Sequence, residues 1–242
     1  MSKSISSFQP VAKHSRAKSE RHYVQVHVPF ARQLLLARPQ VISYHTNRAR
    51  HEYDLSGNWR KEPAAWRFVV LRFEEGTGLD FTEDERQVVS DDHKNCLKGM
   101  RGFSVTESVL HHSLTGQTSL AKYLFEFDRH PTTAAEEARE RAHNLAHSFV
   151  DATSETFGLR RVALNLVRRE AATEPMEEEG QRITDRVLPE TDKVAYLEVY
   201  FDHEEWGDPI FARDDIRLLL QDPFFAKVSG YKVDERCGLD RR

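Results

Sequence analysis

The sequence predicts an α+β fold built from two tandem ferredoxin-like βαββαβ units, and a weak internal repeat is the main observation behind this prediction. The strand-like segments "GFSVTE" and "GYKVDE" begin at Gly102 and Gly230, an offset of 230 − 102 = 128. The apolar segments around Val69 and Leu197 have the same offset, 197 − 69 = 128. This constant spacing indicates a duplicated unit.

Further upstream the offset changes, as a duplication with one longer loop would require. The segment "HVPFARQLLLARPQVISYHTN" aligns with "HSFVDATSETFGLRRVALNLV", which pairs His27 with His147 at 147 − 27 = 120. The change falls between the second and third predicted strands, where the second copy carries the longer loop. We therefore place the two repeats at 1–112 and 113–242.

Each half has the pattern strand, helix, strand, strand, helix, strand. In the second half, alternating Tyr, Phe and Leu predict a strand over 120–128. Helix formers predict a helix over 132–158, with a Thr as N-cap and Gly158 as its stop. Strands are expected over 160–169, 193–201 and 226–235, and a helix over 211–222. The first half follows the same order, although Pro10 interrupts its weakly patterned first strand, 4–13.

Two long polar segments separate the second and third strands of each half, 47–65 and 169–192. Both fit solvated surface loops, but loops of this length in a compact domain are often functional, so one of them could cover a pocket.

The composition excludes several classes of function. The 242 residues carry a formal net charge of −4, which provides no general attraction to nucleic acid or to an anionic membrane. No apolar run approaches the roughly 20 residues that span a bilayer, and the N-terminus lacks the apolar core of a secretory signal. Cys96 and Cys237 form no metal-binding or disulfide pattern, so we expect a cytoplasmic protein.

A short motif adds a family resemblance. The segment "ERHYVQVHVPFARQL" (Glu20–Leu34) resembles the "H-x-P-L/F-A" pattern of the EthD family of dimeric α/β-barrel proteins. The "GF" and "GY" at 102 and 230 are similar to the start of that family's last strand. The resemblance covers roughly 17–107. In the second half His147 lacks the following proline, which puts a functional role there in doubt.

The resemblance implies two ferredoxin-like sheets packed into one barrel within the chain. It also implies an enzyme without metal or organic cofactor, such as a lactone isomerase or a decarboxylase, dehydratase or cyclase of polyketide-like aromatics in secondary metabolism. Fold alone does not settle function.

His27 is the first candidate for chemistry. An imidazole with a pKa near neutrality can both accept and donate a proton. Pro29 can disrupt the helix and leave the imidazole facing a cavity between the sheet and the helices of the first half. Tyr23 lies four residues earlier on the same helix face, where its phenol could bond the imidazole or a substrate oxygen. The alternatives are a helix-end histidine bonded to a carbonyl and a tyrosine packed on the sheet.

Further candidates come from the neighbouring elements. Strand alternation places His45 and Tyr44 on opposite faces, so only one of them can enter a given pocket. His45 is taken as a third catalytic candidate, whereas the predicted substrate-binding residues are Tyr44, Trp66, Phe30 and His147. Trp66 could equally pack in the core.

We expect no metal site. His143 and His147 have the i, i+4 spacing of metal ligands, but the sequence specifies no third ligand. No phosphate-binding loop, dinucleotide motif or nucleophile elbow appears.

The sequence thus favours a cofactor-independent lyase or isomerase that uses a histidine as acid and base on a hydrophobic, oxygenated small molecule. Two alternatives remain open. One is a haem-binding barrel enzyme with a histidine as axial ligand, and the other is a non-catalytic binding or accessory protein. No nucleic acid or membrane partner is expected, and a homodimer is possible.

Overall fold

Eight antiparallel strands close into a barrel in the computed structural model, which describes residues 1–117, 119–173 and 192–241. The strands of the barrel are β1 (Ser2–Pro10), β2 (Val41–Tyr53), β4 (Arg67–Phe73), β5 (Leu97–His112), β6 (Ala121–Arg129), β7 (Leu159–Thr173), β8 (Lys193–Phe201) and β9 (Phe225–Asp240). They follow the order β2-β4-β1-β5-β7-β8-β6-β9, and pairing of β2 with β9 closes the ring. A short strand, β3 (Trp59–Lys61), adds to β2 outside the ring.

Each half of the chain supplies four neighbouring strands. The first half forms the run β2-β4-β1-β5, the second forms β7-β8-β6-β9, and the β5–β7 and β2–β9 pairings join the two runs. The predicted α+β class is confirmed, and the structure shows one closed barrel within the chain. The boundary between 1–112 and 113–242 stays a prediction, because the closed ring couples the two halves through continuous hydrogen bonding.

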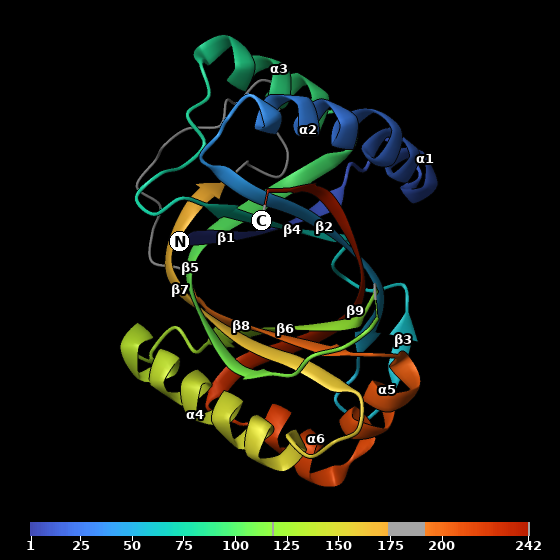
Figure 1. Cartoon of the computed structure of the whole chain (residues 1–242), viewed down its shortest axis with the longest axis vertical. Coiled ribbons are helices and arrows are strands. Elements are labelled where there is room, and N and C mark those ends of the chain that lie inside the picture. Colours follow the sequence, from blue (N-terminus) through green and yellow to red (C-terminus); the bar gives the residue numbers. More distant parts are fainter. Residues whose placement is uncertain (118, 174–191, 242) are drawn as a thin grey trace.

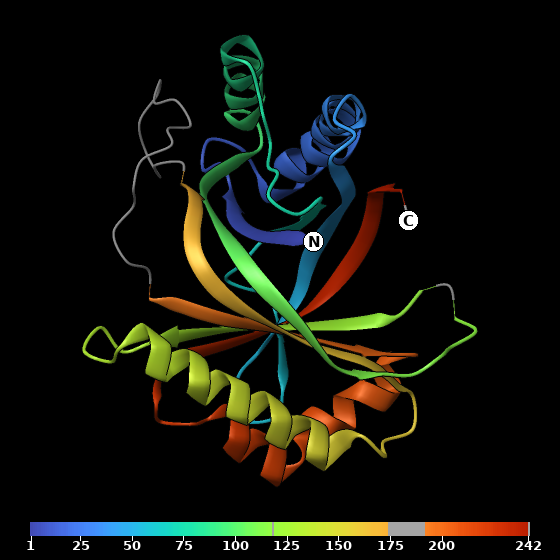
Figure 2. The same cartoon turned by 60° about the vertical axis from the view of Figure 1, so that its left-hand side comes forward.

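Helices cover the barrel on two opposite sides (Figure 1). On one side lie α1 (Arg16–His22), a π-helical turn η1 (Tyr23–His27), α2 (Val28–Leu36) and α3 (Glu83–His93). On the other lie α4 (Ala135–Thr153), α5 (Glu204–Ala212) and α6 (Asp214–Leu220). Figure 2 shows both helical layers standing outside the ring of strands. No described helix is long and apolar enough to cross a membrane.

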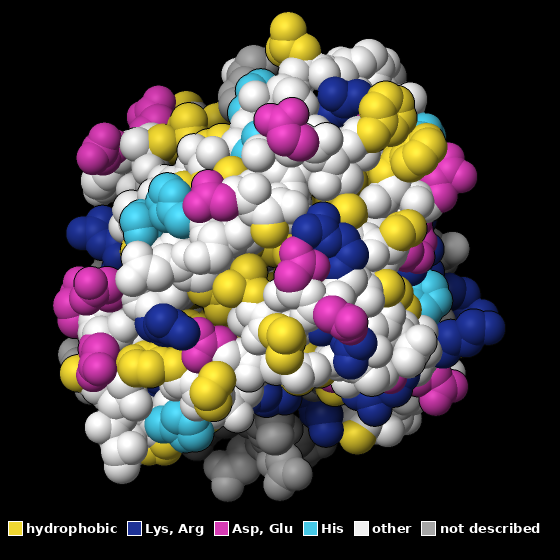
Figure 3. All heavy atoms as spheres, turned by 90° about the horizontal axis from the view of Figure 1, so that it is seen from below, with side chains coloured by type: hydrophobic (Ala, Val, Ile, Leu, Met, Phe, Trp, Pro, Cys, Tyr) yellow, Lys and Arg dark blue, Asp and Glu magenta, His cyan; other side chains and the backbone are white. Residues whose placement is uncertain are grey.

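Three hydrophobic regions follow from the alternation of side chains along the strands. Ile5, Phe68, Phe103 and Tyr196 are among the buried residues that fill the barrel interior. A larger cluster packs the outer face of the second half against α4, α5 and α6, and two smaller ones pack the first half against α2 and η1. The outer surface over α4, α5 and α6 mixes acidic, basic and hydrophobic side chains (Figure 3).

Charged side chains are also buried inside the barrel, beside the apolar ones. Glu198 of β8 is 1% exposed, and its carboxylate accepts hydrogen bonds from two lysines that are themselves buried, Lys3 of β1 and Lys122 of β6. The Nζ atom of Lys122 lies 2.7 Å from Glu198 and 2.5 Å from Glu235. Because both faces of the strands are covered, these side chains have little contact with water, and each would be costly to bury as an ion without its partner.

Several local predictions differ from the structure. The predicted loop 47–65 begins as strand, because β2 continues to Tyr53 and pairs there with Gly230 of β9. The predicted helix 211–222 is two helices separated at Arg213. The helix of the second half begins after Ala134, which has no side-chain cap, and not after a capping threonine. Of the predicted loop 169–192, residues 169–173 belong to β7 and 174–191 lie outside the described residues.

The Glu198 interactions predict a strong effect on stability. Glu198→Gln leaves two buried lysines without their shared carboxylate, so we expect a loss of roughly 3–5 kcal/mol in the free energy of unfolding. Urea denaturation followed by circular dichroism measures this loss. Glu155→Gln, the same change at an exposed position, is the control. Equal stability of the two variants would contradict the prediction.

Candidate active site

A π-helical turn positions His27. The backbone N–H of Val28 donates to the carbonyl of Tyr23, five residues earlier, so the turn holds one residue more than an α-helical turn. Pro29 lies within the first two positions of α2, which follows η1 directly. The helical path continues through Pro29 and does not end there. Tyr23 and His27, the two ends of the turn, are both buried.

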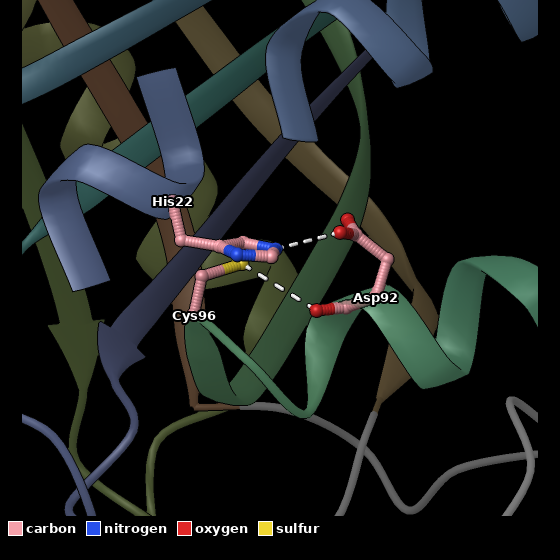
Figure 4. A group of neighbouring side chains, drawn as sticks. All are labelled: His22, Asp92 and Cys96. Atoms are coloured by element: carbon pink, nitrogen blue, oxygen red, sulfur yellow. Dashed lines mark hydrogen bonds and ion pairs between the residues drawn. The ribbon is translucent and has the colours of Figure 1, made fainter. Parts of the chain in front are cut away.

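Asp92, in the last turn of α3, connects two histidines across the helical layer. Its Oδ2 lies 2.6 Å from Nδ1 of His27, and its Oδ1 lies 2.8 Å from Nε2 of His22. Figure 4 shows the His22 ring pointing at the Asp92 carboxylate, with the Cys96 thiol directed at the Asp92 backbone carbonyl. His27 is 7% exposed, so the Asp92–His27 hydrogen bond is largely shielded from water.

The protonation states follow from burial and from these hydrogen bonds. Burial alone would raise the pKa of the Asp92 carboxyl, but the hydrogen bonds from His27 and His22 outweigh it and hold that pKa below its usual range. Burial lowers the pKa of His27 below its ordinary value of 6.5, and Asp92 offsets only part of the effect. At neutral pH the imidazole is therefore uncharged and donates its Nδ1 proton to an ionised Asp92.

The other imidazole nitrogen of His27 has no hydrogen-bond partner among the described side chains. Nε2 bonds to none of the described side chains, and it is not among the fully buried, unbonded polar atoms of the described residues. With the proton on Nδ1, Nε2 carries the lone pair. An oriented, uncharged imidazole with an accessible lone pair is the arrangement of a general base.

Tyr23 packs directly on this base. Its ring centroid lies 4.7 Å from that of His27, and the Arg67 guanidinium lies 4.2 Å from the centroid of the same Tyr23 ring. Burial raises the pKa of Tyr23 well above its ordinary value and that of Tyr44 to about 12. Both phenols therefore stay protonated at neutral pH. Neither hydroxyl has a hydrogen-bond partner among the described residues.

Trp66 is a packing residue in this structure. It is 1% exposed, its ring centroid lies 5.9 Å from that of Phe8 and 5.5 Å from that of Tyr23, and its indole N–H donates to Glu20. The apolar cluster that holds it occupies the space under η1 where the sequence predicted a pocket. Phe30 is half-buried on α2.

His45 belongs to a different compartment. Tyr44 joins the cluster beneath α2, whereas His45 lines a cavity of about 210 Å³ at one end of the barrel interior. Strand alternation thus separates the two residues, as predicted, and His45 lies across the sheet from the helical layer that holds His27. Its Nδ1 lies 3.9 Å from a carboxylate oxygen of Glu235.

His147 joins neither compartment. It is exposed on α4, where its Nε2 lies 3.2 Å from that of His143. Although the repeat pairs it with His27, the structure brings the two histidines to opposite helical layers. Its predicted role in substrate binding therefore gains no support from the geometry.

Two groups of side chains have the donor atoms of a metal site. The ligand atoms of His22, Asp92 and Cys96 lie within 4.8 Å of one another, and a second group combines His45 with Cys237 and Asp240. Among the described residues no third ligand joins His143 and His147. The expectation that the protein needs no metal stays a prediction.

Asp92 and His22 are the candidates that sequence reasoning did not select. Asp92 lies 65 residues from His27, so no local spacing relates them. One signal was present: Asp91 and Asp92 fall at the C-terminal end of a helix, where the helix dipole disfavours negative charge. A carboxylate in that position indicates a compensating partner such as His27.

Comparisons with known proteins concern the fold. No protein-family model matches the sequence, and a search of curated proteins finds no match. Among solved structures, an anthrone oxidase-like protein has a TM-score of 0.55 at 9% identity, with 100% of this chain and 96% of that chain covered. A Fusobacterium nucleatum protein named as a monooxygenase has a TM-score of 0.51 at 8% identity, with 98% and 93% covered. These likenesses show that the chain shares an overall fold with these proteins, compatible with the dimeric α/β-barrel class.

Proposed function

We propose that this protein is a small-molecule enzyme in which His27, oriented by Asp92, acts as general base and acid. The observation that carries the proposal is the 2.6 Å contact between Nδ1 of His27 and Oδ2 of Asp92, together with the unbonded Nε2 on the opposite side of the ring. An ionised Asp92 fixes the tautomer and stabilises the imidazolium that forms when Nε2 accepts a proton.

The first chemical step is proton abstraction. A C–H bond beside a substrate carbonyl breaks, its proton moves to Nε2 of His27, and the electron pair remains on the substrate as an enolate. Return of the proton to another atom completes an isomerisation, and loss of a leaving group completes a dehydration. General-base catalysis of this kind contributes about 10²–10⁴-fold to the rate.

The substrate that suits this site is a flat, enolisable aromatic ketone. The His27 ring is only 7% exposed and is flanked by Tyr23, so an apolar molecule must present its acidic C–H to the narrow accessible part of the ring. The name of the anthrone oxidase-like structural neighbour points to a ketone of this kind. Isomerisation, dehydration and cofactor-free oxidation of such a ketone can each begin with this proton transfer.

We also propose that the barrel is built from two ferredoxin-like units, one from each half of the chain. Each half places its helices after its first and third barrel strands and orders those strands 2-3-1-4, as in β2-β4-β1-β5. This order supports two ferredoxin-like units of EthD type in tandem. A haem cofactor remains the alternative, and an absorption spectrum with a Soret band from the purified protein would favour it.

Anthrone provides a direct test of proton abstraction. In anaerobic D₂O, the protein should accelerate exchange of the acidic methylene protons of anthrone, followed by NMR. His27→Gln should lower this acceleration by about 10²–10⁴-fold because it removes the base. His147→Gln, the same change at an exposed histidine, should leave the rate unchanged. Full activity of His27→Gln in a folded protein would exclude His27 as the base.

The pKa of His27 determines the pH dependence. Because burial holds that pKa below 6.5, exchange should stay at its plateau at neutral pH and decline only below pH 6.5 as Nε2 becomes protonated.

Asp92→Asn removes the group that raises the pKa of His27. The decline should therefore shift to lower pH, and the plateau rate should fall by about 10–100-fold because the tautomer is no longer fixed. A pH profile combined with ¹⁵N NMR of the imidazole measures both effects. An unchanged profile and tautomer would show that Asp92 does not act through His27.

A further inference from the structure

The cavity at the end of the barrel interior has no part in the proton transfer at His27. It measures about 210 Å³ and is lined from both halves of the chain, by side chains that include Arg72 of β4, Arg161 of β7, and Glu198 and Tyr200 of β8. The connection after β5, through Ser113 and Thr115, lies at its edge. Its walls combine charged groups with apolar surface.

The ionised groups around this cavity do not balance. Four buried or half-buried cations share three carboxylates, with Glu107 accepting from Lys3, Arg72 and Arg161 at 2.7–2.9 Å. Lys122 lies between the other two carboxylates, Glu198 and Glu235. Burial would raise the pKa of all three carboxyls, but the nearby cations outweigh it and hold each pKa below its ordinary value, so each is ionised at neutral pH. Among the described residues one formal positive charge therefore remains in excess, counting Lys3, whose own pKa burial lowers.

Arg160, the third arginine that lines the cavity, does not change this charge balance. Arg160 donates to both carboxylate oxygens of Asp202, at distances of 2.5–2.9 Å, so its charge is already compensated. The excess positive charge belongs to the cations that converge on Glu107. A bound anion would remove the excess without displacing any existing ion pair.

Arg161 has a donor to offer such an anion. Its Nη2 bonds to Glu107 at 2.9 Å, whereas its Nη1 bonds to none of the described side chains and is not among their fully buried polar atoms, so Nη1 is accessible. A carboxylate is the acceptor that matches guanidinium geometry best.

The size of the cavity limits the rest of the ligand. A cavity of about 150 Å³ can hold a benzene molecule, so about 210 Å³ has room for a single ring with a carboxylate. Val70, Leu120 and the Tyr200 side chain line it and provide apolar contact for such a ring.

We propose that this cavity binds a small organic acid consisting of one carboxylate and a ring-sized apolar body, with the carboxylate at Arg161. The site is separate from His27, since it lies inside the barrel and His27 lies in the helical layer outside it. An effector acid and an acidic product are both compatible with this chemistry.

Benzoate is the probe that tests the proposal. In isothermal titration calorimetry at low salt, the full chain should bind benzoate at least tenfold more tightly than benzyl alcohol, which lacks the charge. It should also bind benzoate at least tenfold more tightly than acetate, which lacks the ring. Arg161→Gln should weaken benzoate binding by tenfold or more.

Matched variants establish whether benzoate binding depends on Arg161 itself. Arg168→Gln, the same change at an exposed position of β7, should bind benzoate like the wild type, and so should His27→Gln. Thermal unfolding checks that Arg161→Gln remains folded. The proposal is overturned if benzoate does not bind at millimolar concentration, if acetate binds equally well, or if Arg161→Gln binds benzoate unchanged. Retained binding by His27→Gln would show that this site stands whether or not the proposed catalytic role of His27 does.

Discussion

Closure of the barrel is the constraint on which the rest of this structure depends. Once β2 pairs with β9 and β5 with β7, every barrel strand has hydrogen-bonded neighbours on both edges and the barrel leaves no open edge. Each strand must then fill an enclosed interior with one face and pack against helices with the other. This explains why Glu198 and Lys122 are paired so closely: a charge placed inside the ring has little water to replace a missing partner.

The same enclosure separates the two candidate sites. Adjacent residues of β2 point to opposite sides of the sheet, so Tyr44 contributes to the helical layer near Tyr23 while His45 contributes to the interior cavity. The chemistry proposed for His27 depends on the helical layer, where the π-helical turn brings its ring to Asp92 of α3. The interior cavity instead depends on side chains drawn from both halves. One sheet thus separates the two candidate sites, with one on each of its faces.

The sequence was informative about the fold where a pattern of residues repeats at a constant spacing along the chain. The offset of 128 between Val69 and Leu197 predicted equivalent strands, and these residues lie on β4 and β8, which hold the same place in the two halves of the barrel. Predictions from the sequence were weakest where the strand-pairing or hydrogen-bonding partner comes from a distant segment of the chain. Residues 47–53 are strand because β9, together with β4 and β3, pairs with them, and Asp92 meets His27 because α3 packs beside η1. Neither relation leaves a local pattern, so periodicity and spacing could not reveal them.

The β2–β9 pairing also has a consequence for how the chain is made. It joins Ser43 to Asp240, so the ring cannot close until β9 has left the ribosome. Until then the first four strands expose the face that carries Ile5 and Phe68, together with the unpaired edge of β2. Contacts of such long sequence separation form slowly, and open edges favour association with other chains. Closure thus protects the folded protein, but it leaves the nascent chain with an open strand edge and an uncovered apolar face until β9 is made.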